Sequence, residues 1–204
     1  MSKRKGDLFV ISAPSGTGKT TLARALLKLL PDLRHSVSYT TRKRRPGEID
    51  GIDYRFISEA EFTRMAEACE FLEWAKVHGN FYGTSEKALK AMTGQGVDVL
   101  LDIDTQGARQ TREKLPDAVL IFILPPSLKT LKERLVGRKS DSPEDIKKRL
   151  KRALDEIKEY KIYDYVILND KLEEALEELK AVVLARRASV SKVDPDWVKS
   201  QFLR

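Results

Sequence analysis

The chain contains 204 residues, which fits one compact domain with insertions better than two independent domains. It carries 38 Lys and Arg against 31 Asp and Glu, so its net charge of +7 suits anionic ligands. A single cysteine, Cys69, cannot form an intramolecular disulfide, and the first apolar run is far too short for a signal peptide or a membrane span. We therefore expect a soluble cytoplasmic protein with no membrane partner, in which Cys69 is buried and inert.

The basic residues are clustered rather than spread. They gather at residues 42–45 and again over residues 132–152, while the remainder of the chain has mixed charge. Clusters of this kind favour pockets for phosphate groups. Nucleic acid is the rival ligand, but no aromatic residues are interleaved with the basic ones as a stacking platform requires, so we expect no nucleic-acid partner.

Four apolar runs, taken in chain order, predict the strands of a parallel sheet. They cover residues 8–11, 97–101, 119–124 and 165–168, and turn residues followed by helical periodicity come after each. This order is typical of an α/β fold with a parallel sheet flanked by helices.

Capping and breaking residues bound the predicted helices. The first covers residues 19–30 and is stopped by Pro31, Ser127 caps a second, and Ser142 with Pro143 opens a third. A fourth, long helix precedes a tail over residues 189–204 that holds a short helix begun by Asp194. The apolar stripes are expected at Leu22, Leu26 and Leu30; at Leu128, Leu131 and Leu135; at Ile146, Leu150, Leu154 and Ile157; and at Leu172, Leu176, Leu179 and Val183.

The segment over residues 36–89 has a different character. Short alternating stretches lie at residues 54–57 and 79–82, a capping box lies at residues 58–61, and several Gly and Asn turns separate them. We interpret this segment as an inserted β-rich lobe.

A phosphate-binding loop is predicted between the first strand and the first helix. Gly16 and Gly18 can turn backbone N–H groups inward, Lys19 can reach the β- and γ-phosphates, and the Thr20 hydroxyl can bind Mg²⁺. Ala13 replaces the first glycine of the motif and must therefore adopt an ordinary backbone conformation. A plain strand-to-helix turn needs no ligand, but it would not require Gly-Lys-Thr at the helix start.

Two acids follow the second apolar run. Asp102 stands just beyond a buried strand, where a phosphate-loop protein needs a carboxylate for Mg²⁺, and Asp104 could face a second ligand. The alternative is that these acids only cap the next helix.

A basic segment at the start of the lobe suggests a second phosphate site. Arg42 and Arg45 offer planar guanidinium forks that suit a phosphate monoester, although a solvated basic loop would look the same. Other residues of the lobe could complete a nucleoside monophosphate pocket: Tyr54, Glu73, Tyr82 and Thr84. Glu73 lies between large apolar residues, where an unpaired carboxylate is costly unless it binds a ligand.

Seven ordered motifs together resemble the guanylate kinase family. They read SAPSGTGKT, SYTTRKRRPGE, GIDY, FLEWA, GNFYGT, LDIDTQG and ILPPS, and the resemblance spans about residues 8–185. It implies a phosphotransferase of purine nucleotide metabolism that makes GDP and ADP from ATP and GMP or dGMP, with Mg²⁺. The implied parts are a core (residues 6–35, 95–126 and 160–188), a GMP-binding lobe (36–94) and a helical lid (127–159).

The resemblance also implies roles for individual residues. Ser38, Glu73 and Asp104 would hold guanine with Thr84 nearby, while Arg42, Arg45, Tyr54 and Tyr82 would hold the GMP phosphate. The ATP site would comprise Ala13, Pro14, Ser15, Gly16, Thr17, Gly18, Lys19, Thr20, Thr21 and Asn169, with Thr20 and Asp102 toward the metal. Lys19, Arg42 and the lid arginines Arg134, Arg138 and Arg149 would stabilise the transferring phosphoryl group. Lys139 departs from the glycine usual after that second lid arginine.

Two rival functions stay open at the level of sequence. One is a catalytically inactive guanylate-kinase-like module that binds phosphopeptides, which the presence of Lys19, Thr20 and Asp102 argues against. The other keeps the chemistry but uses a different acceptor. The tail residues Trp197 and Phe202 could pack within the chain or on a second copy, so a homo-oligomer also stays open.

Overall fold

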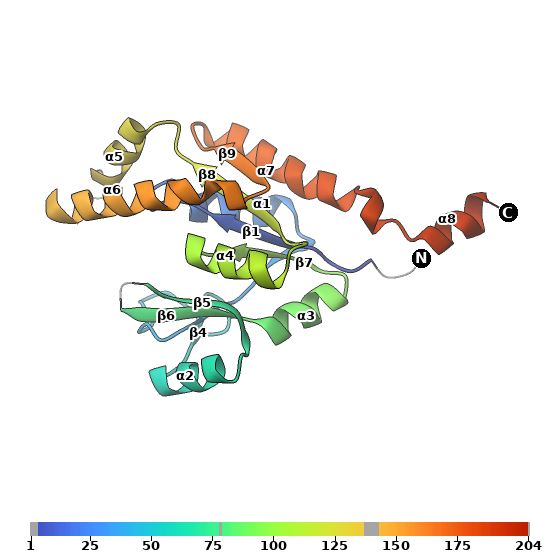
Figure 1. Ribbon diagram of the computed structural model, residues 1–204, viewed down its shortest axis with the longest axis horizontal. Coiled ribbons are helices and arrows are strands. Elements are labelled where there is room, and N and C mark those ends of the chain that lie inside the picture. The colour runs from blue at the N-terminus through green and yellow to red at the C-terminus, as the bar shows by residue number, and fades with distance from the viewer. Residues whose placement is uncertain (1–3, 78, 137–142, 204) are drawn as a thin grey trace.

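The computed structural model describes residues 4–77, 79–136 and 143–203 and contains two sheets (Figure 1). The larger sheet has the strand order β2-β7-β1-β8-β9, and all its neighbouring strands are parallel. Its strands are β1 (Leu8–Ser12), β2 (Leu33–His35), β7 (Asp98–Asp102), β8 (Val119–Leu124) and β9 (Tyr165–Leu168). The four predicted strands are thus confirmed, and β2 is an edge strand too short to have been predicted.

Helices cover both faces of this sheet because its strands are apolar on both sides. Phe9 and Ile11 of β1 pack toward α1 (Lys19–Leu29) and α7 (Leu172–Arg187). Leu8 and Val10 point the other way, into a cluster that includes Leu89 of α3 (Glu86–Gly94) and residues of α4 (Thr105–Lys114). The sheet is therefore enclosed on both faces, and its carboxyl-terminal edge is left for ligands.

The predicted helices are confirmed, with three corrections to their buried faces. In α7, Leu172 is exposed, and Ala175 is buried together with Leu179 and Val183. Ser127 caps α5 (Leu128–Val136) by accepting from the Thr130 N–H at 3.0 Å, but Leu128 is exposed and only Leu131 and Leu135 of that stripe are buried. In α6 (Pro143–Lys158), Leu154 is exposed and Ala153 is buried in its place. A small side chain at this position allows α6 to lie close to Leu131 and Leu135 of α5.

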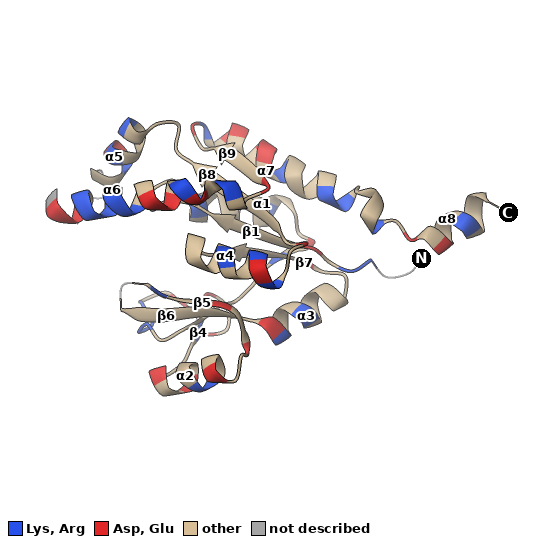
Figure 2. Cartoon of the chain, in the orientation of Figure 1, with Lys and Arg blue, Asp and Glu red and all other residues tan. Residues whose placement is uncertain are grey.

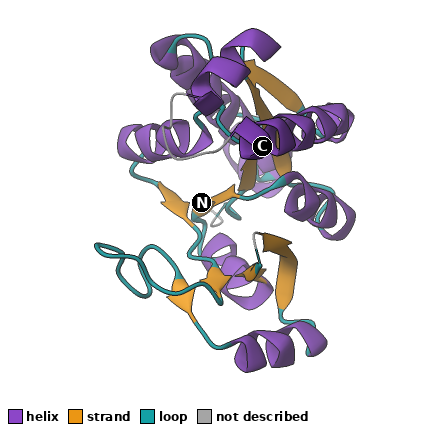
Figure 3. Cartoon of the chain, turned by 90° about the vertical axis from the view of Figure 1, so that its left-hand side faces the viewer, coloured by secondary structure: helices purple, strands orange, loops and turns teal. Residues whose placement is uncertain are grey.

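The smaller sheet has the order β4-β3-β6-β5 and packs against α4 of the core through β5, with α2 (Glu59–Glu67) on the side away from the larger sheet (Figures 1 and 3). Its strands are β3 (Tyr39–Thr40), β4 (Arg55–Phe56), β5 (Phe71–Val77) and β6 (Asn80–Ser85). Phe62, Met65 and Phe71 form its own buried cluster, with the Phe62 and Phe71 rings stacked at 4.5 Å between centroids. The β-rich lobe predicted from the sequence thus has a separate small core.

Cys69 is exposed, so the expectation of a buried thiol is wrong. Helix α2 ends at Glu67, and Cys69 adopts a left-handed conformation with φ of 53°. Its N–H donates to the Ala66 carbonyl and the Glu70 N–H donates to the Met65 carbonyl, both at 3.0 Å. These bonds are the Schellman arrangement, in which the residue after the helix cap usually is glycine and stands at the surface.

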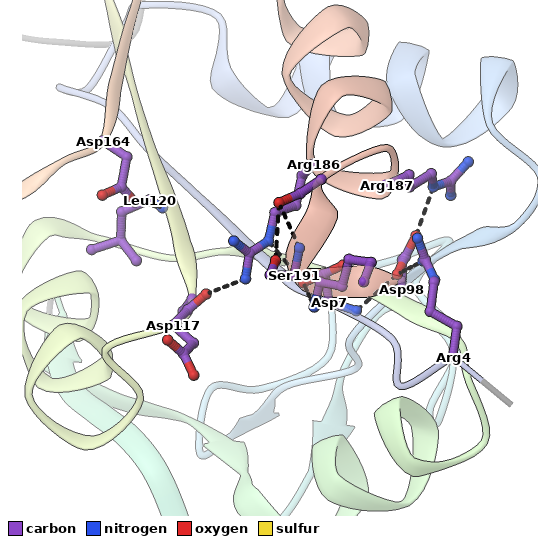
Figure 4. A network of polar contacts seen from close by, with 12 residues as sticks. Arg4, Asp7, Asp98, Asp117, Leu120, Asp164, Arg186, Arg187 and Ser191 are labelled. Carbon is purple, nitrogen blue, oxygen red and sulfur yellow. Dashed lines mark hydrogen bonds and ion pairs between the residues drawn. The ribbon is translucent and has the colours of Figure 1, made fainter. Parts of the chain in front are cut away.

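Buried acids tie the carboxyl-terminal end of α7 to the amino-terminal ends of β1 and β7 (Figure 4). Asp98 pairs with Arg4 and, at 2.7 Å, with Arg187, while Asp7 pairs with Arg186 at 3.0 Å. Beyond this clamp, α8 (Pro195–Phe202) begins at Asp194 as predicted, and Trp197 contacts Phe202 edge to face. None of the helices in the described residues has the length and apolarity needed to cross a bilayer.

Candidate active site

The loop between β1 and α1 has the backbone of a phosphate-binding loop. Gly16 and Gly18 have φ values of 94° and 97°, whereas Ala13 is not among the described residues with positive φ, as expected. The buried Thr17 hydroxyl donates to the Pro14 carbonyl at 2.7 Å and fixes the turn. Lys19, the first residue of α1, contacts Asp102 at 2.5 Å and donates to the Ile103 carbonyl at 2.7 Å. The loop thus presents its N–H groups and Lys19 at the carboxyl edge of the sheet.

Groups from distant segments hold this loop from behind. The Asn169 amide, which follows β9, donates to the Thr17 carbonyl at 2.6 Å, and Arg134 of α5 donates to the carbonyl of Asn169 at 3.0 Å. A Cβ on Gly18 would lie 2.6 Å from the Asn169 amide nitrogen. Glycine is therefore required here both for its positive φ and for the close approach of Asn169.

Helix α6 reaches the front of the loop. Arg149 donates to the Ser15 hydroxyl at 2.7 Å, and Arg149, Arg152 and Glu156 line a cavity of about 340 Å³ with the phosphate loop. Other residues around this cavity are Ala13, Ser15, Gly16, Gly18, Lys19, Thr20, Thr21, Val77 and Asp104. Arg138 and Lys139 lie outside the described residues. The cavity combines backbone N–H groups with cationic side chains, which suits a chain of phosphates.

A second cavity, of about 150 Å³, lies between the lobe and the core and contains the predicted base-binding residues. Glu73 of β5 is 4% exposed and accepts a hydrogen bond from the Thr84 hydroxyl at 2.5 Å, and the Ser38 and Thr84 hydroxyls are 3.4 Å apart. Burial raises the pKa of Glu73 to about 7. Lys19, Asp102 and Asp104 line the same cavity from the core side, so the phosphate loop and Glu73 face one space.

The basic segment of the lobe lines a third cavity, of about 470 Å³. Arg42 makes a two-pronged ion pair with Glu48 at 2.7 and 3.0 Å, and its guanidinium lies 5.4 Å from the Tyr54 ring centroid. The Arg42 guanidinium and the Arg45 N–H hold the pKa of Glu48 at about 2. Arg42, Arg45, Tyr54 and Tyr82 all line this cavity, so the structure brings together the residues expected to hold a phosphate.

Thr20 and Asp102 also line the third cavity, and both present oxygen atoms. Among residues 4–77, 79–136 and 143–203, no group of three His, Cys, Asp or Glu side chains could hold a metal by itself. Mg²⁺ needs no such cage, since it keeps several waters and binds one or two protein oxygens together with substrate phosphates. The donor set therefore fits Mg²⁺ that arrives with a nucleotide.

Comparisons with known proteins agree with this geometry. The family model described as guanylate kinase matches residues 5–186. The chain belongs to the guanylate kinase family. It is 55% identical to the guanylate kinase of Geobacter sulfurreducens over 191 residues, which cover 94% of each chain. It is 51% identical to that of Symbiobacterium thermophilum over 187 residues, covering 92% of this chain and 89% of the relative.

A solved guanylate kinase has the same fold. The crystal structure of the enzyme from Anaplasma phagocytophilum superposes with a TM-score of 0.80 at 35% identity, over 98% of this chain and 97% of that one. The predicted α/β architecture is thereby confirmed.

Four residues of this guanylate kinase site were not singled out from the sequence. Glu48 lies within the motif SYTTRKRRPGE, and Arg152 and Glu156 lie within the predicted lid (residues 127–159), where the sequence indicates no role for them. Gly107 of α4 is the fourth: a Cβ there would lie 2.5 Å from a Glu73 carboxylate oxygen. Helical spacing could have indicated Arg152 as a site residue, because it follows Arg149 by three residues and therefore lies on the same face of α6.

Proposed function

We propose that the chain transfers the γ-phosphoryl group of ATP to GMP or dGMP, forming ADP and the corresponding diphosphate. One observation carries the proposal: the buried Glu73 carboxylate and Lys19 of the phosphate loop line the same cavity. A base held by Glu73 would therefore place its nucleoside monophosphate beside the loop that binds the donor phosphates. Membership of the guanylate kinase family supports the choice of substrates.

The chemistry of guanine fits Glu73. Guanine presents N1–H and an exocyclic NH₂ side by side, and one ionised carboxylate can accept both hydrogen bonds. Adenine lacks that donor pair and would leave the buried acceptor unpaired, a mismatch that can cost about 10⁴ in specificity. The Ser38 and Thr84 hydroxyls and Asp104 supply the remaining polar contacts.

The residues around the phosphate loop would do the transfer mainly by position and charge. Phosphoryl transfer has a loose transition state, so it needs stabilised oxygens rather than a strong base. Lys19, Arg42, Arg134 and Arg149 would supply that charge from three helices, α1, α5 and α6, and from the loop after β3. Lys19 would exchange the Ile103 carbonyl for phosphate oxygens when ATP binds.

Mg²⁺ would be held toward Thr20 and Asp102, and when bound it neutralises charge on the β- and γ-phosphates. Arg138 keeps the lid role that the family resemblance gives it, as a proposal. We expect the enzyme to act in the cytoplasm.

An inactive module would not need Lys19, Thr20 and Asp102, all of which are present at one edge of the sheet.

The test of the proposed function is the steady-state kinetics of Glu73→Gln, with Glu67→Gln as the control because that glutamate is exposed at the end of α2. We expect Glu73→Gln to raise KM for GMP by about 100-fold while KM for ATP changes little, and Glu67→Gln to be silent. An unchanged KM for GMP in Glu73→Gln would overturn the assignment of guanine to this cavity.

A further inference from the structure

One cation of the phosphate cavity has no role in the function proposed above. Arg152 lies on α6 one turn beyond Arg149, and it lines the cavity of about 340 Å³ with the phosphate loop. Figure 2 shows that basic and acidic residues follow one another closely along this helix. Arg152 differs from the exposed Lys151 beside it because its guanidinium faces two carboxylates, one on its own helix and one on the core.

The contact with the core is made to Asp104. The nearest Arg152 nitrogen lies 3.8 Å from Oδ2 of Asp104, within ion-pair range but longer than a hydrogen bond. Oδ1 of Asp104 is already used, because it accepts the Gly107 N–H at 2.9 Å as the cap of α4. Oδ2 is buried and has no hydrogen-bond partner among the described residues. Among the contacts of the described residues, Arg152 is the only cation within ion-pair distance of this oxygen.

The contact on the helix holds Arg152 in place. Its Nε donates to Oε1 of Glu156 at 3.0 Å, and Glu156 lies on the same face of α6. Burial raises the pKa of Glu156, which shows that this carboxyl group, like Asp104, is partly withdrawn from water. A single guanidinium between two such carboxylates lowers their mutual repulsion, and it does so beside a loop built to bind phosphate.

Asp104 stands at the boundary between the two substrate cavities. It lines the cavity shared with the phosphate loop and also the cavity that contains Glu73. The Arg152 guanidinium of α6 therefore contacts a carboxylate that also faces the proposed guanine base. The lid helix and the base-reading carboxylate are linked through one side chain.

We propose that Arg152 is a positioning residue for the acceptor nucleotide, acting through Asp104. It keeps the Asp104 carboxylate oriented toward the guanine pocket, and it links that carboxylate to the helix whose Arg149 contacts the phosphate loop. Occupation of the donor site and recognition of guanine are thereby coupled through α6. This inference rests on the proposed function, because it assumes that the cavity containing Glu73 receives GMP.

The test is a double-mutant cycle on KM for GMP, using Arg152→Met, Asp104→Asn and the combined variant. Asparagine caps helices as well as aspartate does, so Asp104→Asn preserves α4. We expect Arg152→Met to raise KM for GMP about tenfold in the unchanged protein but less than about twofold when Asp104 is already Asn. KM for ATP and kcat should change less, and Arg152→Lys should restore part of the affinity.

Lys151→Met is the matched control, because it removes the same charge from an exposed position on the same helix. It should leave KM for GMP unchanged, and thermal unfolding should show that all variants are folded. Equal effects of Arg152→Met in the two backgrounds, or an effect confined to KM for ATP, would overturn the proposal. If the unchanged protein formed no ADP in response to GMP, the proposed function itself would fail, which is a different result.

Discussion

The sites proposed for the donor and for the acceptor are built in opposite ways. The donor loop is one continuous segment, and its shape comes from backbone conformation: two glycines at positive φ and a lysine at the first position of a helix. The acceptor site is built from side chains of the lobe and the core that are far apart in sequence, such as Ser38, Glu73 and Asp104. A site formed by backbone groups tolerates most substitutions of neighbouring side chains. A site formed by side chains depends on every residue that positions one of those side chains.

The largest effect should come from the donor side. Lys19→Met removes the cation that links the phosphate loop to Asp102, and we expect kcat to fall about 10³-fold because charge stabilisation is the main source of rate. The matched control is Lys28→Met, at an exposed position of the same helix. A variant at Lys19 with more than a tenth of the normal kcat would contradict the donor assignment.

Arg42→Lys tests whether the proposed acceptor site depends on the geometry of this side chain as well as on its charge. Lysine keeps the charge but loses the two-pronged pairing with Glu48 and the stacking against Tyr54. We expect kcat/KM for GMP to fall about 100-fold, measured beside Arg44→Lys, an exposed arginine of the same loop. Equal activity of the two variants would mean that only net charge matters in this loop.

Gly107→Ala tests the dependence of the proposed acceptor site on the position of a single carboxylate, Glu73. The new Cβ would lie 2.5 Å from Oε2 of Glu73, so the carboxylate must shift. We expect KM for GMP to rise about tenfold with little change in KM for ATP, since a well-oriented hydrogen bond to a charged group is lost. Gly94→Ala, where a Cβ would have nothing within 4 Å, serves as the control and should be silent.

The smallest effect should be the pH dependence of GMP use. Burial raises the pKa of Glu73 to about 7, and only the ionised form accepts both guanine donors. We expect kcat/KM for GMP to rise about fourfold from pH 6.5 to 8.5, as the ionised fraction grows, and Glu73→Gln to lack that rise. A profile that is the same in both proteins would assign the titration to another group, such as the GMP phosphate.

The same shift predicts a change in stability. The folded protein holds the Glu73 proton more tightly than the unfolded chain does, so ionisation favours unfolding. The contribution of Glu73 to the free energy of unfolding should be fully present below about pH 4.5 and should decline as the pH rises to 7. Chemical denaturation of the unchanged protein and of Glu73→Gln across this range measures the difference.

The fold was predictable from the sequence because apolar runs and helix caps are local signals. Strands of four to six apolar residues, the break at Pro31 and the cap at Ser127 all depend on neighbours in the chain. The apolar periodicity of the sequence was less reliable for predicting which side chains of a helix are buried. Both Ala153 and Leu154 can continue the stripe of α6, and only the packing against α5 decides that the smaller side chain is inside.

The conformation of the phosphate loop was predictable from its own residues, whereas the residues proposed for the acceptor site come mostly from the family resemblance. Nothing local to Arg152 indicates that it faces Asp104, 48 positions away in the chain. Nor does a glycine in α4 indicate that a carboxylate from β5 lies against it. Such contacts depend on the way the lobe docks on the core, which is a property of the tertiary structure.

We propose that the two cavities lined by both Lys19 and Asp104 are the sites for ATP and GMP. The most direct measurement is ADP formation by the purified protein with Mg-ATP and, separately, GMP, dGMP, AMP, CMP and UMP, beside Arg42→Ala. We expect turnover with GMP and dGMP alone, and no turnover in Arg42→Ala. ATP binding without turnover on any acceptor, or turnover with a different acceptor, would contradict it.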